Sequence, residues 1–420
     1  MTALDHTAVE TIQRGQPDWR APQISEAFAA FQAQDVPTGA EEEWRYVELD
    51  FDLDSLALTT DGGAAMPAGP FLTSALDDAA GRIQIIDGRV VDVALEVGDV
   101  SVKRMAEVDR LETAAPVDRD KFAAAHLAFA TDGAVVAVRP GAVVESPIVV
   151  DIQATQPGTI SFPHVEFLVG ANAQAGLIVV YRSPEGLEAV AVPDVVLTAE
   201  DGAQLRFMSV QGWDLATTGL VHQRLRLGRD ATGRVGEVGL GGKVARLDLA
   251  VDLEGTGSSA EVVGVYFGED HQTLDYRMTI NHIGRNTTSD VFMKGAVEDH
   301  AQSVFTGLLR IEKDAVRTSA FETNRNLVLS EHAKAHSVPN LEILCNDVVC
   351  GHGSSVGPLE QEHLYYLQSR GISRPRAERM LVRGFFSEVI ERLPFDTVAE
   401  PIEEAVFRRF TQAQEEGRLS

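Results

Sequence analysis

Thiols are scarce in this chain, since only two cysteines, Cys345 and Cys350, occur among its 420 residues. Two cysteines cannot build the disulfide framework of a small secreted domain, so reduced thiols are expected. Both stand in one short run, Cys345-Asn-Asp-Val-Val-Cys350-Gly-His352-Gly, together with a histidine. That run is the first candidate for metal or cluster chemistry, against the alternative that the thiols are small core residues.

Basic residues are also few, and long apolar runs are missing. The 36 Lys and Arg residues face 63 Asp and Glu residues, a formal charge of -27. This balance argues against nucleic acid or an anionic membrane surface as a partner. The first residues lack the basic and apolar regions of a signal peptide, and no run is long enough to cross a bilayer. We therefore expect a cytoplasmic protein that contacts no membrane.

The composition and hydrophobic periodicity of the sequence change twice along the chain. Residues 1–130 are predicted to form an N-terminal region of helical and mixed structure. Residues 131–357 consist of short β-branched runs separated by Gly, Asn, Asp and Pro, which predicts a β-rich core. Residues 358–420 return to helical periodicity, which predicts a C-terminal helical domain.

Small-residue corners recur through the β-rich core every 24 to 32 residues, as a repeat architecture requires. The clearest corners are Gly170-Ala-Asn-Ala, Asp201-Gly-Ala, Asp230-Ala-Thr-Gly and Gly257-Ser-Ser-Ala. Such a period suits a β-solenoid, because each coil buries its inward face against its neighbours. A β-sandwich is the alternative, but the Asn-Gly hairpin signals that it favours are missing. We predict a parallel β-helix.

Three amphipathic helices are expected after the core. They are predicted over Leu359–Arg370, over about Ser373–Leu393, and from Pro401 onward. These helices could cap the open end of a solenoid, or they could dock a partner, and the two roles are compatible.

The pair Cys350 and His352 carries the sharpest chemical signal. In an extended strand they lie on one face, about 7 Å apart along it, so both could approach one metal or cluster. Cys345 has the opposite parity and is expected to be structural. His352 stands between two glycines, which leave room for a cofactor or another backbone to approach.

Two enzymatic alternatives use other residues of the chain. A β-helix carbohydrate-active enzyme would need paired carboxylates in a groove, and Glu269, Asp270, Asp275 and Asp299 are available. Only 6% of the residues are aromatic, which is few for stacking sugars. A mononuclear metalloenzyme could draw its ligands from the histidines. They are His271, His282, His300, His332, His336 and His352.

Four C-terminal segments resemble a known family. They are Asn324-Arg-Asn-Leu-Val-Leu-Ser330, Leu341-Glu-Ile343, Asp347-Val-Val-Cys-Gly-His-Gly-Ser-Ser-Val-Gly357 and Leu364-Tyr-Tyr-Leu-Gln-Ser-Arg-Gly-Ile372. Together they resemble the C-terminal signature of the SufB/SufD family of iron–sulfur cluster assembly proteins. The likeness extends upstream to Glu41-Glu-Glu-Trp-Arg-Tyr46, Thr131-Asp-Gly133 and Ser303-Val-Phe-Thr-Gly307. The Cys-x-His-Gly element and the length look like the SufD branch of the family.

The resemblance implies a fold and a role. The fold is a right-handed parallel β-helix core flanked by N-terminal and C-terminal helical regions. The role is a non-catalytic scaffold in a SufBCD complex, with a SufB-like paralogue as heterodimer partner and a SufC-like ATPase docked on the helices at about 359–393. His352, with Cys350 beside it, matches the cluster-site position.

The same resemblance implies how the cargo is held. A transient iron–sulfur cluster or iron would lie at the shared interface, and the isolated chain is expected to bind none tightly. A homodimer is possible when the partner is absent.

Overall fold

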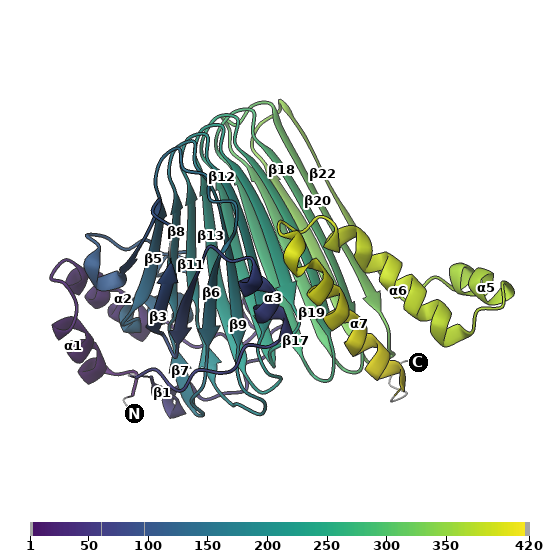
Figure 1. Ribbon diagram of the computed structural model, residues 1–420, viewed down its shortest axis with the longest axis horizontal. Coiled ribbons are helices and arrows are strands. Elements are labelled where there is room, and N and C mark those ends of the chain that lie inside the picture. Colours follow the sequence, from purple (N-terminus) through teal and green to yellow (C-terminus); the bar gives the residue numbers. More distant parts are fainter. Residues whose placement is uncertain (1–2, 60, 96, 416–420) are drawn as a thin grey trace.

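The chain folds as a parallel β-solenoid of about eight turns, with helices packed on its sides, in a computed structural model (Figure 1). The structure describes residues 3–59, 61–95 and 97–415. The predicted parallel β-helix is confirmed, and the β-sandwich alternative is wrong, because the strands of each wall pair in parallel except at the N-terminal end. None of the described helices combines the length and the apolar character needed to cross a membrane.

Two sheets form the walls of the solenoid, and from β11 onward successive strands alternate between them. Sheet A has the order β21-β19-β17-β15-β13-β11-β8-β5-β4, with β1, β7 and β10 at its side. Its strands are β1 (Ala57–Leu58), β4 (Val100–Arg104), β5 (Gly133–Val138), β7 (Thr159–Ser161), β8 (His164–Val169), β10 (Val190–Ala191), β11 (Asp194–Ala199), β13 (Thr218–Leu227), β15 (Val244–Leu253), β17 (Thr273–His282), β19 (Gln302–Ile311) and β21 (Lys334–Ile343).

Sheet B has the order β22-β20-β18-β16-β14-β12-β9-β6-β2-β3. Its strands are β2 (Gly81–Ile86), β3 (Arg89–Leu95), β6 (Ile148–Gln153), β9 (Gln174–Arg182), β12 (Gln204–Gly212), β14 (Thr232–Gly239), β16 (Ser259–Gly268), β18 (Thr288–Val297), β20 (Thr318–Val328) and β22 (Val348–Gly357). The core expected over 131–357 thus holds β5 to β22. The preceding strands β2, β3 and β4 join the same two sheets.

The small-residue corners turn the chain from one wall to the other. Each of the four corners seen in the sequence contains one residue with positive φ: Asn172, Gly202, Asp230 and Gly257. Glycine, asparagine and aspartate adopt this backbone conformation most easily, which explains their recurrence. The corners also bond to one another, because Asn172 N–H donates to the Asp201 carbonyl and Gly202 N–H donates to the Arg229 carbonyl.

Alternate residues of each strand fill the interior between the walls. This interior is one continuous cluster of buried Val, Leu, Ile and Ala side chains with a few aromatics, among them Phe167, Phe207 and Phe305. Fully burying one such side chain contributes about 1.5–3 kcal/mol, so the stacked coils hold one another in register.

The N-terminal helices cover the outer face of sheet A. They are α1 (His6–Arg14), α2 (Arg20–Ala33) and α4 (Lys121–Phe129), with short 3-10 turns at Glu42–Trp44, Leu53–Ser55 and Met105–Glu107. Asp120 caps α4 by accepting the Phe122 and Ala123 N–H groups, each at 2.9 Å. The helices share an apolar core with Val192 and Leu220 on the solenoid side.

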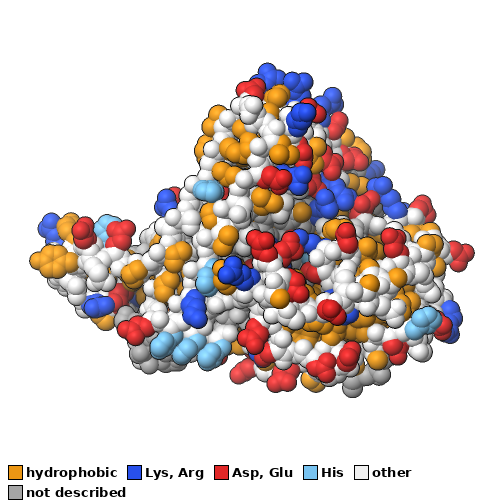
Figure 2. Space-filling model, turned by 180° about the vertical axis from the view of Figure 1, so that it is seen from behind, with side chains coloured by type: hydrophobic (Ala, Val, Ile, Leu, Met, Phe, Trp, Pro, Cys, Tyr) orange, Lys and Arg blue, Asp and Glu red, His pale blue; other side chains and the backbone are white. Residues whose placement is uncertain are grey.

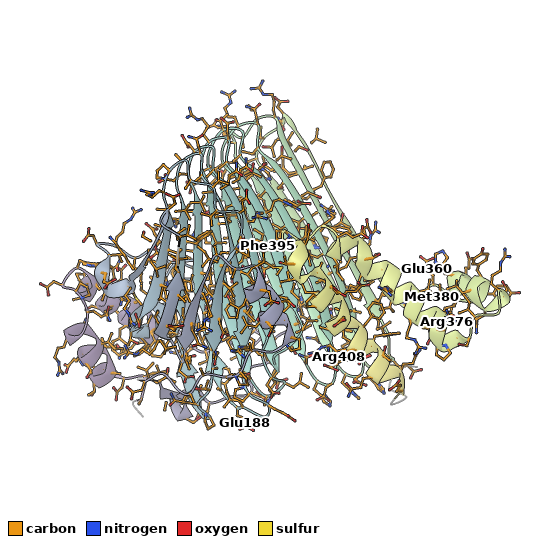
Figure 3. All side chains as sticks on the ribbon, viewed as in Figure 1. Glu188, Glu360, Arg376, Met380, Phe395 and Arg408 are labelled. Atoms are coloured by element: carbon orange, nitrogen blue, oxygen red, sulfur yellow. The ribbon has the colours of Figure 1, made fainter. Side chains whose placement is uncertain are left out.

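A second set of helices covers the outer face of sheet B (Figure 1). It consists of α3 (Pro70–Asp77), α6 (Arg374–Ile390), the 3-10 turn Asp396–Val398 and α7 (Ala399–Glu415). Phe395 points toward the sheet (Figure 3) and lies against Gly176, where an added Cβ would stand 2.7 Å from the ring. The remaining helix, α5 (Gln361–Ser369), projects away from the sheets (Figure 1).

Candidate functional site

Strands β21 and β22 form the last coil of the solenoid, here called the terminal coil. Each is the final strand in the order of its sheet, so among the described strands no further one pairs with its outer edge. Six apolar side chains of this coil are exposed: Val338, Leu341, Ile343, Leu344, Val349 and Val356. An edge with this composition is a surface on which another chain can pair.

Cys350 and His352 lie on the same face of β22, as their spacing predicts. They pair in register with Ala320 and Glu322 of β20. Cys350 is partly buried and packs against the interior cluster, whereas His352 is exposed at the open end. The terminal coil therefore presents an imidazole with a thiol beside it at the mouth of the solenoid.

Glu322 lies in the interior, one coil below His352. Its side chain is buried, and neither carboxylate oxygen has a hydrogen-bond partner among the described residues. Burial raises the pKa of Glu322 to about 8. The space for its carboxyl group comes from Gly307, because a Cβ on that residue would overlap Glu322 Oε2.

Other polar side chains lie near Glu322 in the interior. Asn326 donates a hydrogen bond to Asn324 Oδ1 at 2.6 Å, and Asn324 donates to the Tyr266 hydroxyl at 3.2 Å. In the terminal coil, Ser354 of β22 bonds to Ser337 of β21 at 2.8 Å, which closes the coil across its interior. The interior below His352 thus carries several polar side chains.

Cys345, the second thiol of the chain, lies in the interior. It follows β21, is 8% exposed, and belongs to the interior apolar cluster. This placement agrees with the structural role expected from its sequence position. The described donors at the mouth are a thiol, an imidazole and, beneath them, a buried carboxyl group.

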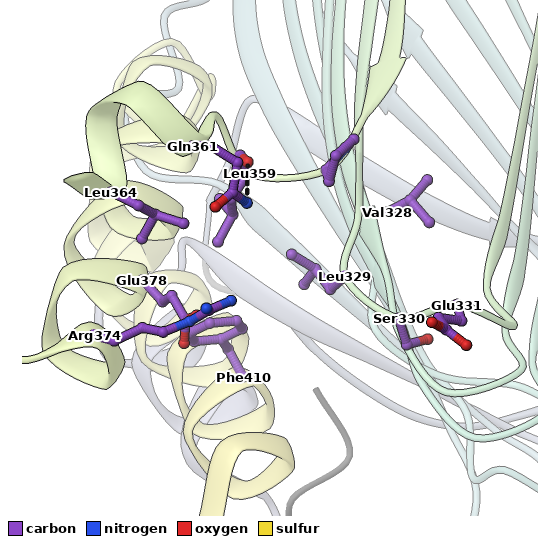
Figure 4. Close-up of a pocket in the computed structure, with 11 residues that line it drawn as sticks. Val328, Leu329, Ser330, Glu331, Leu359, Gln361, Leu364, Arg374, Glu378 and Phe410 are labelled. Atoms are coloured by element: carbon purple, nitrogen blue, oxygen red, sulfur yellow. Dashed lines mark hydrogen bonds and ion pairs between the residues drawn. The ribbon is translucent and has the colours of Figure 1, made fainter. Parts of the chain in front are cut away.

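Two clefts separate the terminal coil from the C-terminal helices. One, of about 340 Å³, is lined by Leu329, Leu364, Arg374, Glu378 and Phe410 among others (Figure 4). The other, of about 730 Å³, runs beside Gly353 to Gly357 and reaches His363 and Phe385. Helix α5 and the adjoining part of α6 therefore stand clear of the solenoid.

The carboxylates of the carbohydrate-enzyme alternative have other partners. Asp275 is buried in an ion pair with Arg246, and Glu269 pairs with Arg409 of α7. Asp270 and Asp299 occupy positive-φ corner positions, where aspartate is favoured for its backbone conformation. Each of these four acids thus has a structural explanation.

The histidines of the metalloenzyme alternative are not gathered around His352. His271, His300 and His332 are exposed and stack on successive coils, with ring centroids 4.8 and 4.9 Å apart. Histidine side chains form a row at the lower edge of the face in Figure 2. His282 is buried and bonds to Thr287 and Ser289.

The last of these histidines, His336, lies on the outer side of β21. Its ring stacks on that of Tyr46, with centroids 4.2 Å apart. This contact ties the N-terminal region to the terminal coil, and it gives His336 a structural role.

Sequence reasoning missed Glu322 and a buried group formed by His126, His164 and Asp194. The signal for Glu322 is its parity, because it alternates in β20 with Ala320 and Asn324, which also face inward. The signal for the buried group is a spacing of one coil period between His164 and Asp194. Both signals can be interpreted only when the pairing register of the strands is known.

Comparison with known proteins agrees with this architecture. Residues 151–385 match the family model described as SUF system FeS cluster assembly, SufBD core domain. The chain is 29% identical over 421 aligned positions to an iron-sulfur cluster assembly SufBD family protein of Mycobacterium leprae, covering 98% of both chains. It is 24% identical over 380 positions to the iron-sulfur cluster assembly protein SufD of Escherichia coli, covering 89% of both.

A third relative extends the comparison. The chain is 28% identical over 299 positions to SufD of Bacillus subtilis, covering 70% of this chain and 68% of the relative. The family model spans more than half of the chain, and the segments it matches include the strands that carry His352 and Glu322. The chain therefore belongs to the SufB/SufD family of iron–sulfur cluster assembly proteins of the SUF system.

Proposed function

We propose that the chain is a non-catalytic scaffold subunit of an iron–sulfur cluster assembly complex. Its terminal coil pairs with a SufB-like paralogue, and His352, with Cys350 beside it, contributes to the nascent-cluster site at that interface. The observation that carries the proposal is the exposure of His352 on an unpartnered coil whose apolar side chains also face solvent. Family membership supplies the reaction context.

The terminal coil supports pairing with a paralogue of the same fold. A second solenoid can add its own edge strands to β21 and β22, while Val349 and Val356 lose their exposure to water. In the absence of the paralogue, a second copy of this chain can use the same edge, so the isolated chain forms a homodimer under this proposal.

The chemistry of the donors suits a transient cargo. Thiolates and imidazoles are the usual protein ligands of iron–sulfur clusters, and a mixed set leaves a cluster easier to transfer. In this proposal His352 supplies a neutral imidazole from one side of the interface and the paralogue supplies thiolate from the other. The cluster is held while it forms and then leaves.

The C-terminal helices support docking of a SufC-like ATPase at about 359–393. Tyr365, Tyr366 and Met380 are exposed there, and aromatic and Met side chains dominate many protein interfaces. Figure 3 places Met380 and Arg376 on the part of α6 that leads away from the sheets. The other part of α6 is fixed to the solenoid, because Lys294 donates to the Phe385 carbonyl at 2.7 Å. Motion of the ATPase would therefore reach the solenoid through α6.

Cluster assembly by the reconstituted complex tests the role of His352. The chain, the paralogue and the ATPase are mixed anaerobically with ferrous iron and a sulfur donor, and visible absorption follows cluster formation. We expect His352→Ala to slow assembly by about tenfold or more, as loss of a metal-site residue commonly does. His271→Ala, which removes an exposed histidine elsewhere, should leave the rate unchanged. An unchanged rate for His352→Ala would refute the assignment.

Two variants, one on each proposed docking surface, test the two surfaces independently. Val349→Lys places a charge on the terminal coil and should release the paralogue while the ATPase still co-purifies. The double substitution Tyr365→Ser with Tyr366→Ser should release the ATPase while the paralogue still binds. If both variants lost both partners, or neither lost any, the two surfaces would not have the separate roles proposed.

A further inference from the structure

A buried cluster of His126, His164 and Asp194 lies between α4 and sheet A, outside the terminal coil. The side chains are 1%, 0% and 3% exposed, respectively. One ring nitrogen of each histidine and one carboxylate oxygen all lie within 4.8 Å of one another. Buried groups of this kind require partners, since an unpaired charge in the interior is costly.

Rigid elements position all three residues. His164 begins β8 and Asp194 begins β11, and the two pair directly in the parallel register of sheet A. His126 comes from the helix packed above them, and its ring lies 5.5 Å from that of His164, centroid to centroid. Two histidines and one carboxylate thus converge from a sheet and from the helix that covers it.

Each member of the cluster is held from behind by another group. His126 Nδ1 donates to the Val192 carbonyl at 2.8 Å, which leaves the Nε2 lone pair facing the cluster. His164 Nε2 faces Glu166 Oε1 at 3.4 Å, so Nδ1 faces inward. Asp194 accepts the Ala114 N–H on both oxygens, at 3.1 and 3.0 Å. Metal-binding histidines and carboxylates are oriented by outer partners of this type.

The distances inside the cluster are long for hydrogen bonds. His126 Nε2 lies 3.3 Å from His164 Nδ1, and that nitrogen lies 3.4 Å from Asp194 Oδ1. Two ligand atoms each about 2.0–2.1 Å from one tetrahedral metal ion are separated by roughly 3.3–3.4 Å. Two of the three separations in the cluster are therefore close to the edge length of a tetrahedral coordination shell.

We propose that His126, His164 and Asp194 bind a divalent transition-metal cation, zinc or ferrous iron, which fastens α4 to sheet A. Two imidazoles and a carboxylate are ligands that both ions accept. This site is separate from the nascent-cluster site. A metal bound here would be held by the isolated chain, contrary to the expectation from the sequence that the isolated chain binds none tightly. Because it is buried, the ion enters as the chain folds.

A proton is the competing occupant of the cluster. Burial alone lowers the pKa of His164, but the nearby carboxylates of Asp194 and Glu166 outweigh burial and raise the pKa to about 9. Burial lowers the pKa of His126 to about 4, so this ring is neutral and its Nε2 can accept a hydrogen bond or bind a metal. His222 and Asp120, which lie 3.6 Å apart nearby, complete the charged groups around the site.

Refolding of the isolated full-length chain distinguishes a metal from a proton. The chain is unfolded in denaturant with a chelator and refolded with Co²⁺, Zn²⁺ or, anaerobically, Fe²⁺. Metal content and the visible spectrum of the Co²⁺ protein are then measured. We expect one equivalent of metal and the intense absorption of low-coordinate Co²⁺. His126→Gln should lower the content at least tenfold.

Control variants make the outcome specific to this site. His282→Gln alters another buried histidine of sheet A, which bonds only to hydroxyl groups, and should retain the full equivalent. His352→Ala should also retain it, so failure of this inference is distinguishable from failure of the proposed function. Less than about a tenth of an equivalent in the wild type, or equal binding by His126→Gln, would overturn the proposal. If His126→Gln does not fold, the metal content of the refolded wild-type chain still tests the proposal.

Discussion

Glu322 of β20 and His352 of β22 occupy the same register position on adjacent strands, with the carboxyl group buried and the imidazole exposed. The buried position keeps the proton on Glu322 at neutral pH, since its pKa is raised to about 8. At the open end of the solenoid, a neutral, protonated carboxyl group therefore lies beneath an exposed imidazole that could bind a metal. This pairing leads to the first two predictions.

The contribution of Glu322 to stability is expected to fall as pH rises toward 8. The unfolded chain releases the Glu322 proton above the ordinary glutamate pKa of 4.5, whereas the folded chain keeps it up to about pH 8. The contribution of Glu322 to stability is therefore fully present at low pH and is lost between these two pH values. Each pKa unit of the shift corresponds to roughly 1.4 kcal/mol. Burial raises the pKa of Glu237 to about 8 as well, which adds a second contribution of the same sign.

Urea unfolding at several pH values checks this expectation. Glu322→Gln should make the decline in stability between pH 5 and pH 8 less steep than in the wild type, and the double variant with Glu237→Gln should reduce the slope further. Glu331→Gln changes an exposed carboxylate and should leave the profile as in the wild type. A Glu322→Gln profile parallel to that of the wild type would contradict the assignment.

Gly307 is expected to tolerate no side chain while Glu322 is present. A Cβ at this position would overlap the Glu322 carboxylate, so Gly307→Ala should destabilise the chain by about 1–3 kcal/mol, as overpacking usually does. The same change in a Glu322→Ala background should cost much less. As a control, Gly384→Ala in α6 meets nothing within 4 Å and should stabilise the chain slightly. Equal effects in the two backgrounds would show that the residues do not interact.

Lys294 is expected to hold the C-terminal helices on sheet B. Its buried ammonium donates to the Phe385 carbonyl at 2.7 Å and to Glu388 at 2.6 Å. Lys294→Met should lower stability by about 1–3 kcal/mol and speed proteolytic removal of the helices, because α6 loses this attachment. Lys313→Met, at an exposed position, is the matched control. Undiminished protection in a protease time course would argue against this role.

The two thiols are expected to react at different rates. Cys350 is partly exposed at the mouth, whereas Cys345 is 8% exposed within the interior cluster. A thiol reagent should label Cys350 first and Cys345 about a hundredfold more slowly, since the latter needs local opening. Cys350→Ala should abolish the fast phase, and Cys345→Ala should keep it. Added SufB-like paralogue should slow the fast phase if the terminal coil is the interface.

Local signals in the sequence predict much of the fold. The corners are readable because a positive φ at Asn172 or Gly202 demands a particular residue type. The helices predicted over Leu359–Arg370 and Ser373–Leu393 are found as α5 and α6, with ends a few residues shorter. Caps, prolines and apolar stripes mark such elements within a few turns of chain.

Contacts between distant segments are less predictable. Asp194 lies beside His164, 30 residues away, only because the coils align without a shift, and His126 joins them only because α4 packs on that face. Glu322 is an ordinary acid in the sequence, and its burial depends on the space left by Gly307. Cys350 and His352 could be placed on one face from spacing alone, but the exposure of His352 depends on β22 being the last strand.

The regular register also determines how this molecule should open. Each coil bonds only to the coils before and after it, so amide hydrogen exchange is expected to be slowest near the middle of the solenoid and to quicken toward β22. His352 then stands in the segment that opens at the lowest free energy. A partner can rearrange this last coil, strand by strand, without unfolding the coils that precede it.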